Sequence, residues 1–587
     1  MKNLLIYLKQ YTKESILAPF FKLLEVVFDL LVPLVVAGMI NHKGAEGSSE
    51  YIWRSFFILL LMAAAGLASC IIAQYFAAKA STGFATNLRS AVFSHIQKFS
   101  FSELDTLGSN TIITRLTDDI NQVQNGVNMG LRLLLRSPFI VVGSMVMAFT
   151  VNAKSALVFV VAVPLLFAVV LTIMLICIPL FKKVQSALDR LTGITRENLA
   201  GVREIRAFCR EKPSVDEFEQ SNRELTKLNK FVGRISALLN PLTYVLINIA
   251  AVYLINSSAI EVNAGNLAQG DVVALYNYML QIIVELIKLA SLIITLTKSV
   301  ACAGRVSGIL KIKPGMEYPD FAYEKNAENR FENTDAVRFD NVTFSYENAK
   351  SPSLCNINLK AEKGQTIGII GGTGSGKSTL ISLIPRFYDA TNGAVFVDGV
   401  NVKNYTKKQL CEKIGTVQQK AALFKGSIRE NLKMGNETAG DSDLWQALRI
   451  AQAEDVVKNK PGELDFEIEQ GGRNLSGGQR QRLSIARALV KKPEILILDD
   501  SSSALDLATD AALRKAINGL NGKMTTFIVS QRISCIMQAD KIAVLDNGRL
   551  LGFDTHENLM KDCEIYKEIY SSQFPENNKA SKREGEL

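Results

Sequence analysis

The chain has 587 residues, of which 48% are hydrophobic, and its formal net charge at pH 7 is +9. This length is enough for at least two domains, and the apolar share argues against an ordinary soluble protein. We interpret the positive charge as basic loops beside a membrane, because no basic cluster alternates with aromatic residues as nucleic-acid binding would require. The eight cysteines show no CxxC pair and no metal-binding spacing, which indicates reduced thiols.

Six apolar stretches in the first half have about the 20 residues that an α-helix needs to cross a bilayer. They are residues 16–40, 55–77, 131–151, 155–179, 235–255 and 272–296. Prolines inside them are compatible with membrane helices, because neighbouring helices can satisfy the freed carbonyl groups. Residues 1–300 are therefore predicted to form an all-α transmembrane domain of six helices. We expect no cleavable signal peptide, because the first apolar run is too long for one.

The connections between these stretches alternate in length and charge. Residues 78–130 and 180–234 are long and rich in Lys and Arg, whereas the other connections are short. The positive-inside rule places both long loops and both termini in the cytoplasm of a multi-pass cell-membrane protein. Both loops have a helical pattern, so two of the membrane helices are expected to continue well beyond the bilayer.

Three acidic residues lie inside the predicted membrane helices. Glu25 and Asp29 are four residues apart on one face of the first helix, and Glu285 lies in the sixth helix, three residues before Lys288. Charges at this depth are costly and usually face either a watery cavity or a partner of opposite charge. Two interpretations stay open with equal weight: an acid-lined cavity, or an internal ion pair.

The second half of the chain has a different character. Residues 301–335 are polar and contain Pro314, Gly315 and Pro319, which predicts a linker. From residue 336 to residue 573, short apolar strands alternate with helical stretches, as in an α/β domain. Residues 574–587 are charged and polar, and we expect them to be disordered.

The strand-like run Thr366–Ile370 is followed by the sequence GGTGSGKST and then by an apolar helical stretch. The pattern GxxxxGK[ST] in this context predicts a phosphate loop, whose backbone N–H groups converge on phosphate oxygens. Lys377 is expected to reach the terminal phosphates, and Ser378 to bind Mg²⁺. The expected nucleotide contacts are Gly371, Thr373, Gly374, Ser375, Gly376, Lys377, Ser378 and Thr379.

A buried strand is predicted at Ile495–Leu498, directly before Asp499. An acidic residue at the carboxyl end of a parallel strand would emerge beside the phosphate loop, where it can coordinate magnesium. The α/β domain is therefore predicted to be a P-loop domain that binds a nucleotide and Mg²⁺.

Between these two motifs lies the pentapeptide LSGGQ, residues 475–479, which resembles the signature of ABC ATPases. The resemblance covers nearly the whole chain, which is similar to a type IV ABC exporter half-transporter of the bacterial multidrug or lipid exporter kind. It implies that two halves dimerise with two ATP molecules between their ATPase domains. Ser476, Gly478 and Gln479 would then contact the nucleotide held by the other half, through N–H groups at a helix start.

The same resemblance assigns roles to further residues. Tyr346 would stack on adenine, although an ordinary strand aromatic explains it equally well. Gln419 would sense and ligate the magnesium ion together with Ser378 and Asp499, and Asp506 would link the two nucleotide sites. The stretch Gly201–Phe208 resembles the coupling helix that docks on the partner's ATPase domain.

Two positions depart from the family pattern. Asp500 stands where the family usually has a catalytic glutamate, and Gln531 stands where it has a histidine. Asp and Glu are both ionised at neutral pH, so the loss is about 1 Å of reach, which can lower a rate ~10²-fold. Gln531 can donate a hydrogen bond to phosphate but cannot carry a positive charge. A milder departure is Gln470–Gly471, where the family often has Glu-Arg.

These departures predict an ATP site that binds nucleotide but hydrolyses it slowly. The favoured hypothesis is a heterodimeric exporter, in which a different half-transporter with an intact glutamate and histidine supplies the competent site. The alternatives are a homodimer with a slow ATPase, an ATP-gated membrane regulator without net transport, and an importer. The expected substrate is a small amphipathic compound, drug-like rather than lipid. Glu25, Asp29 and Glu285 would favour a cation, and neither the substrate nor the partner is a nucleic acid.

Overall fold

The structure is a computed structural model that describes residues 2–42, 49–319, 321, 335–347, 349–501, 504–520 and 524–574. It divides into two compact units. The first comprises Met1–Gln97 and Asn110–Ile312, and the second comprises Lys98–Ser109 and Lys313–Leu587. The predicted disordered tail lies outside the described residues, apart from Phe574.

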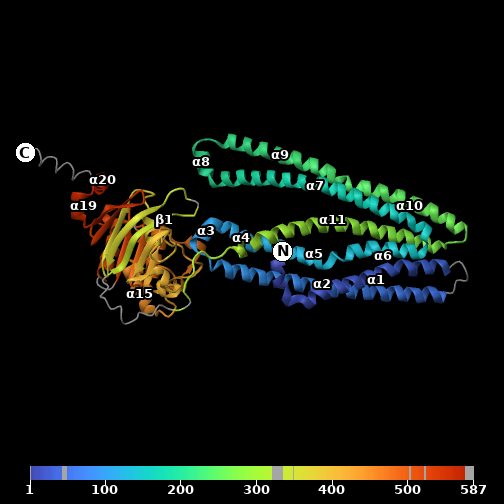
Figure 1. The fold of residues 1–587 in the computed structure, drawn as a ribbon, viewed down its shortest axis with the longest axis horizontal. Helices are drawn as coiled ribbons and strands as arrows, with labels where there is room; N and C mark the ends of the chain where they lie inside the picture. The colour runs from blue at the N-terminus through green and yellow to red at the C-terminus, as the bar shows by residue number, and fades with distance from the viewer. Residues whose placement is uncertain are drawn as a thin grey trace, which may run out of the picture. The chain divides into compact units, whose positions relative to one another are not determined.

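The first unit is built mainly of long helices, joined by a few short ones (Figure 1). They are α1 (Thr12–His42), α2 (Ser49–Ile96), α4 (Ser109–Thr114), α5 (Ile120–Leu133), α6 (Arg136–Val151), α7 (Ala153–Ala200), α8 (Val202–Ala207), α9 (Glu211–Ala237), α10 (Leu239–Asn263) and α11 (Gln269–Lys311), with a 3₁₀ segment at Lys2–Tyr11 and a π-helical turn at Arg115–Asp119. The described residues contain six helical stretches long and apolar enough to cross a membrane, as predicted. With 48 residues, α7 is about 72 Å long, more than twice the apolar core of a bilayer.

The linker predicted at 301–335 begins later in the structure, because α11 continues to Lys311. Cys302, Ala303, Val306 and Ile309 are buried along one face of this last part of α11. Their helical spacing explains the extension, since apolar residues at i, i+1, i+4 and i+7 share a helix face. Within the predicted linker, residues 320 and 322–334 lie outside the described range.

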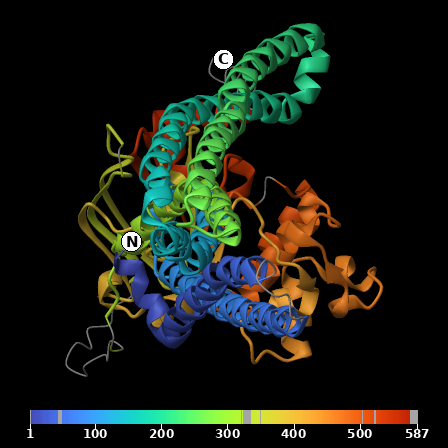
Figure 2. The same cartoon turned by 90° about the vertical axis from the view of Figure 1, so that its right-hand side faces the viewer.

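The helices α7 and α9 form a hairpin joined by α8. At the α8 end this hairpin stands apart from α1, α2 and α5, which is visible in Figures 1 and 2. α9 packs on α7 and meets α8 and α10, and α8 itself buries none of its residues. Phe208, directly after α8, is 77% exposed. The outer faces of the hairpin therefore have no partner within the described part of this unit.

Pro33 interrupts the backbone hydrogen bonding of α1, and α11 compensates for it. Because proline has no N–H, the carbonyl of Asp29 lacks its partner four residues later. The side chain of Gln281 in α11 donates to this carbonyl at 3.2 Å, and the hydroxyl of Tyr278 donates to the neighbouring carbonyl of Leu30 at 2.7 Å. Backbone groups freed by proline must find such partners inside a membrane, where water is absent.

The helices α5 and α11 approach each other closely at Gly126. A Cβ atom on Gly126 would lie 2.3 Å from the Cβ of Ser299. The hydroxyl of Ser299 donates to the carbonyl of Gln122 at 2.5 Å, so the serine is fixed in this position. Two turns further along α11, Arg305 Nε donates to Asp119 Oδ2 at 2.9 Å. The close contact between Gly126 and Ser299 leaves no room for a side chain at position 126.

The substitution Gly126→Ala is expected to destabilise the transmembrane unit by about 1–3 kcal/mol, because an added methyl group overpacks the contact. Thermal unfolding of the purified protein in detergent would measure this loss. Gly130→Ala on the same helix is the matched control, since its Cβ would meet Leu296 at an ordinary 3.7 Å. An equal effect of both alanines would contradict the proposed close approach, and Ser299→Gly should restore the stability of Gly126→Ala.

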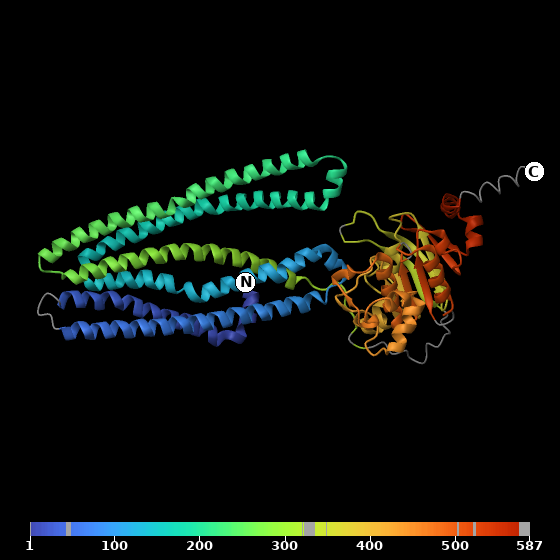
Figure 3. The ribbon, with the colours of Figure 1, turned by 180° about the vertical axis from the view of Figure 1, so that it is seen from behind.

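The second unit contains two main sheets (Figure 3). Its strands are β1 (Asp335–Phe344), β2 (Leu354–Glu362), β3 (Thr366–Gly371), β4 (Asn392–Val397), β5 (Val400–Asn401), β6 (Ile414–Val417), β7 (Gly426–Ser427), β8 (Glu467–Ile468), β9 (Ile495–Asp499), β10 (Thr525–Val529), β11 (Lys541–Asp546) and β12 (Arg549–Asp554). One sheet has the order β2-β1-β4-β5 and is antiparallel; the other has the order β12-β11-β3-β10-β9-β6 and is parallel except for β12.

Helices cover these sheets and complete an α/β domain, as the sequence predicted. They are α3 (Phe101–Leu107), α12 (Lys377–Ser382), α13 (Lys407–Lys413), α14 (Ile428–Lys433), α15 (Asp441–Ile450), α16 (Glu454–Lys458), α17 (Gly477–Val490), α18 (Leu507–Asn518), α19 (His556–Asp562) and α20 (Glu564–Gln573). The strands β3, β9, β10 and β11 are almost entirely buried, which explains their continuous apolar sequences.

Candidate functional site

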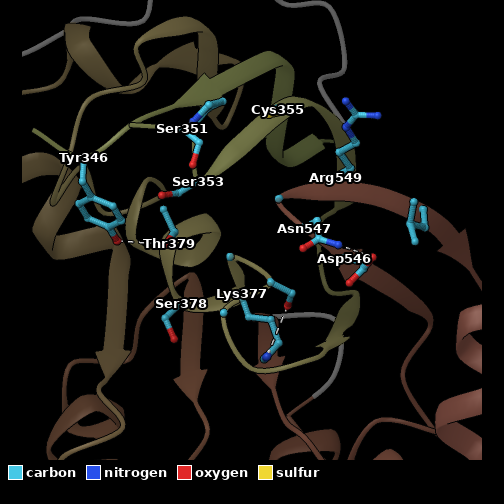
Figure 4. A pocket seen from close by; sticks show the side chains of 16 residues that line it. Tyr346, Ser351, Ser353, Cys355, Lys377, Ser378, Thr379, Asp546, Asn547 and Arg549 are labelled. Atoms are coloured by element: carbon cyan, nitrogen blue, oxygen red, sulfur yellow. Dashed lines mark hydrogen bonds between the residues drawn. The ribbon is translucent and has the colours of Figure 1, made fainter. Parts of the chain in front are cut away.

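The phosphate loop connects β3 to α12 at the carboxyl edge of the parallel sheet. Gly376, just before α12, has φ = +97°, and a Cβ there would lie 2.8 Å from the carbonyl oxygen of Ser353. Only glycine fits this position without strain. The Nζ of Lys377 donates to the carbonyls of Gly371 and Gly372 at 3.0 and 2.7 Å, so it lies inside the loop (Figure 4). Burial lowers the pKa of Lys377, while the charges of Asp500 and Asp499 act in the opposite direction.

The residues predicted to bind magnesium meet at this edge. Because β3 and β9 run parallel in one sheet, their carboxyl ends bring the phosphate loop and Asp499 together. The hydroxyl of Ser378 donates to Asp499 Oδ1 at 3.0 Å. Burial raises the pKa of Asp499, the hydrogen bond from Ser378 lowers it, and the charge of Asp500 raises it. A hydroxyl and a carboxylate at this spacing offer the hard oxygen ligands that Mg²⁺ prefers.

The structure brings Asp500 next to Gln419, which follows β6. Gln419 Nε2 donates to Asp500 Oδ2 at 3.3 Å. Burial raises the pKa of Asp500, while this hydrogen bond and the charge of Lys377 oppose the rise. Asp500 also has φ = +44°, an uncommon backbone conformation for a residue with a side chain. The short carboxylate is therefore directed toward Gln419, within the group predicted to bind magnesium.

Gln531 follows β10, whose last residue Val529 pairs with Asp499 in the neighbouring strand. Its side chain is exposed, and its carbonyl accepts a hydrogen bond from Gln573 at 2.8 Å. The parallel register thus places positions 500 and 531 at the same edge of the sheet. Both departures from the family pattern lie at the end of the sheet that carries the phosphate loop.

Tyr346 lines the cavity at the phosphate loop. Its ring makes edge-to-face contacts with Phe344 and Tyr388, with centroid distances of 4.8 and 5.3 Å. Its hydroxyl and that of Thr379 are 3.0 Å apart, a hydrogen bond drawn in Figure 4. The cavity that Tyr346 and the phosphate loop line has a volume of about 1020 Å³ and is also bordered by Cys355, Asn547 and Arg549. Thr373 lies in the loop but does not line this cavity.

The LSGGQ residues lie elsewhere in the same unit. Ser476 caps α17: its hydroxyl accepts a hydrogen bond from the N–H of Gln479, while Gln479 Oε1 accepts one from the N–H of Ser476. Ser476 is exposed, and none of the residues from Leu475 to Gln479 lines the cavity around the phosphate loop. The N-terminus of α17 therefore does not contribute to the cavity around this chain's own phosphate loop.

Asp506 has a local structural role in the described residues. It caps α18, where its carboxylate accepts hydrogen bonds from the N–H and the hydroxyl of Thr509, both at 2.8 Å. These bonds lower the pKa of Asp506. Capping by aspartate is common at helix starts, so this geometry alone explains the residue type.

One contact of the nucleotide domain was not anticipated from the sequence. The short helix α3, from the first long loop, packs on the domain beside Tyr346. Phe101 contacts the ring of Phe387 at 4.5 Å between centroids, and Tyr388 donates its hydroxyl to Asp105 at 2.6 Å. The hydroxyls of Ser102 and Thr106 donate to Glu347 at 3.2 and 3.3 Å. The only sequence signal was an aromatic residue followed by polar residues in a predicted helical loop.

In the transmembrane unit, the three acids Glu25, Asp29 and Glu285 converge on Arg136. Its guanidinium lies 2.6 Å from Glu285, 3.3 Å from Asp29 and 3.6 Å from Glu25. Asp29, Arg136 and Glu285 also line a cavity of about 490 Å³, which Glu25 does not reach. The structure therefore combines ion pairing with a cavity.

Of the positive partners of these acids, the sequence analysis named only Lys288, beside Glu285, and missed Arg136 and Lys22. Arg136 lies inside a predicted membrane helix, so its charge was a visible signal that it faces a partner. Lys22 pairs with Glu25 at 2.6 Å, and Lys288 pairs with Glu285 at 2.9 Å. Since the cations balance the acids, the acids by themselves give no ground for expecting a purely cationic substrate.

Comparisons with known proteins cover almost the whole chain. Residues 15–286 match the family described as "ABC transporter transmembrane region", and residues 354–503 match the family described as "ABC transporter". An uncharacterized ABC transporter ATP-binding protein of Mycobacterium tuberculosis is 35% identical over 571 residues, which cover 97% of both chains. A putative multidrug export ATP-binding/permease protein of Bacillus subtilis is 30% identical over 583 residues, which cover 98% of this chain and 99% of the relative.

A solved structure described as a bacterial Atm1-family ABC exporter with ATP bound has a similar fold. Its TM-score is 0.78 at 22% identity, and the match covers 97% of this chain and 98% of that one. The fold and the full-length relatives agree with the arrangement of a membrane unit followed by a nucleotide domain. This chain belongs to the ABC transporter family, as an exporter-type polypeptide in which a six-helix transmembrane domain is fused to an ATPase domain.

Proposed function

We propose that this chain is one half of a heterodimeric ABC exporter, and that its own phosphate loop forms a site that binds ATP but hydrolyses it slowly. The observation that carries this proposal is the pairing of Asp500 with Gln419, 3.3 Å apart, where the family has a longer glutamate. A carboxylate shorter by one methylene and directed at Gln419 is poorly placed to activate a water molecule. Gln531 lacks the positive charge that a histidine could supply there.

The groups that hold nucleotide are separate from these two positions. Lys377 and the backbone of the phosphate loop would bind the phosphates, Ser378, Asp499 and Gln419 would hold Mg²⁺, and Tyr346 would stack on adenine. None of these contacts needs a glutamate at position 500. ATP binding without efficient hydrolysis is the expected consequence.

The surfaces that have no partner within the described residues support association with a second half-transporter. The LSGGQ at the start of α17 does not line the cavity at the chain's own phosphate loop. In the described part of the transmembrane unit, the α7–α9 hairpin has outer faces without a partner, and α8 at its tip buries none of its residues. A second half would use the LSGGQ to complete its competent nucleotide site and would receive α8 on its ATPase domain.

In this proposal, ATP binding closes the two ATPase domains, and α3 and α8 transmit closure to the membrane helices. Hydrolysis at the partner's site resets the transporter. Each ligand can shift the conformational equilibrium only through its different affinity for the two states. Both termini and the ATPase domain would lie in the cytoplasm. The relative named for multidrug export supports export of a small amphipathic compound over import or gating without transport.

A homodimer with a slow ATPase is the second candidate, because a second copy of this chain could also cover the hairpin. The full-length chain purified alone in lipid tests whether this chain can hydrolyse ATP without a different partner. We expect tight ATP binding with little hydrolysis, and an increase of up to ~10²-fold in hydrolysis on the combined changes Asp500→Glu and Gln531→His. Robust hydrolysis by the unaltered chain, abolished by Lys377→Ala but not by Lys408→Ala on the surface, would reject the heterodimer.

The signature provides a second test, carried out on the complex recovered by co-purification. Ser476→Arg blocks the anion-binding helix start and should abolish most ATP hydrolysis, because it disables the competent site of the partner. Asp500→Asn should change total hydrolysis less than twofold. The control Thr406→Arg removes the same kind of cap from α13, away from the nucleotide. Loss of hydrolysis with Asp500→Asn would show that this chain's own site is the catalytic one.

A further inference from the structure

We propose that the cavity among α1, α6 and α11 binds an amphipathic zwitterion, a molecule with an ammonium group and an acidic group beside an apolar chain. The inference rests on the proposed export function and names the class of its substrate. Three features carry it: the balance of charge around the cavity, the exposure of one ion pair, and the apolar walls.

Six charged residues beside this cavity are joined by ion pairs into one cluster within the described part of the transmembrane unit. Its members are Lys22, Glu25, Asp29, Arg136, Glu285 and Lys288. Three positive and three negative side chains give a net charge of zero. In the low dielectric of a membrane an unbalanced charge is costly, so a ligand that keeps this balance is favoured over one that changes it.

The ion pairs of the cluster differ in their distances and in how far their side chains are exposed. Lys22–Glu25 and Arg136–Glu285 are both 2.6 Å apart, and the side chains of Glu25 and Glu285 are 11% and 4% exposed. Asp29 lies 3.3 Å from Arg136, and its side chain is 44% exposed. The ion pair between Asp29 and Arg136 is therefore the place where the cluster opens to the cavity.

A ligand with one charge cannot replace this pair without cost. An ammonium group on Asp29 would leave Arg136 as an additional positive charge, held only by carboxylates that already have a lysine. An anion on Arg136 would leave Asp29 without a cation. A zwitterion places its ammonium group on Asp29 and its carboxylate or phosphate on Arg136, so that one internal pair becomes two pairs with the ligand and the net charge stays zero.

The rest of the cavity suits the apolar part of such a molecule. Its walls include Val32, Val36, Ile140, Leu280 and Val284. Asn277 and Gln281 add neutral hydrogen-bonding groups, and a volume of about 490 Å³ lies within the range of small-molecule sites. Gln281 holds the carbonyl of Asp29 and thereby fixes the segment that presents the carboxylate.

The test compares three probes with the same dodecyl chain: dodecyl phosphoethanolamine, dodecylammonium and the phosphate diester dodecyl methyl phosphate, which carries a single negative charge. Equilibrium binding of each radiolabelled probe is measured on the full-length chain in dodecyl maltoside, whose headgroup is uncharged. We expect the zwitterion to bind at least about tenfold more tightly than either singly charged probe, which corresponds to about 1.4 kcal/mol. Equal binding of the three probes, or tighter binding of the cation or the anion, would overturn the proposal.

Variants of the chain test which residue binds the ammonium group and which binds the acidic group of the probe. Asp29→Asn should weaken the zwitterion and the cation about tenfold or more but not the anion. Arg136→Gln alone could unfold the protein, because it removes the cation that pairs with buried acids. The double variant Asp29→Asn with Arg136→Gln is therefore measured beside it, since it keeps the net charge of the cluster at zero. It should bind all three probes equally weakly. Glu261→Gln is the control: Glu261 pairs with Lys154 at 3.1 Å, outside the cavity. Unchanged preference for the zwitterion in the double variant would overturn the proposal.

Binding is measured without ATP and without a partner, so the result is independent of the hydrolysis tests. A chain that binds the zwitterion but hydrolyses ATP rapidly by itself would refute the heterodimer and leave the substrate class standing. A chain with slow hydrolysis and no preference among the probes would refute the proposed substrate class and leave the heterodimer standing.

Discussion

Arg136 carries a positive charge into an apolar helical bundle, and the arrangement of the neighbouring helices follows from the need to compensate it. Its three carboxylate partners come from α1 and α11, so the ion pairs hold α1, α6 and α11 at fixed positions. Buried ion pairs contribute little net stability, but removing one partner costs several kcal/mol. The network therefore specifies how these helices meet. The hydrogen bonds that satisfy the backbone at Pro33 come from α11 and reinforce the same contact.

Local sequence patterns predicted most of the architecture. Apolar runs of sufficient length gave the six membrane helices, and the strand–loop–helix pattern around Lys377 gave the phosphate loop. These features depend on residues close in the chain. The contacts that were missed join residues far apart: Arg136 with Asp29 and Glu285, and Tyr388 with Asp105. No periodicity or spacing encodes such pairs, although a charge inside a membrane helix shows that some partner must exist.

The roles assigned to Asp500 and Gln531 came from a departure within a family pattern, which a single sequence can reveal once the motif is recognised. The structure adds the geometry at position 500, where the carboxylate meets Gln419. In the proposed function, nucleotide binding and hydrolysis depend on different parts of this fold. Phosphate binding would depend on backbone N–H groups and a lysine at the start of α12, whereas water activation would depend on the side chain that follows β9. A substitution at the position after β9 would then leave phosphate binding intact.

The helix α3 has a consequence for how the protein is made. It precedes β1 by more than 200 residues, yet it belongs to the same compact unit as the nucleotide domain. During synthesis α3 emerges before most of the membrane helices, and it cannot pack until the aromatic surface of Phe387 and Tyr388 has been translated. Contacts between such distant segments form late, because closing a long loop is entropically costly. An ATPase domain expressed from residue 313 onward would leave that aromatic surface uncovered. Poor solubility of such a fragment would reflect a missing piece of its own fold.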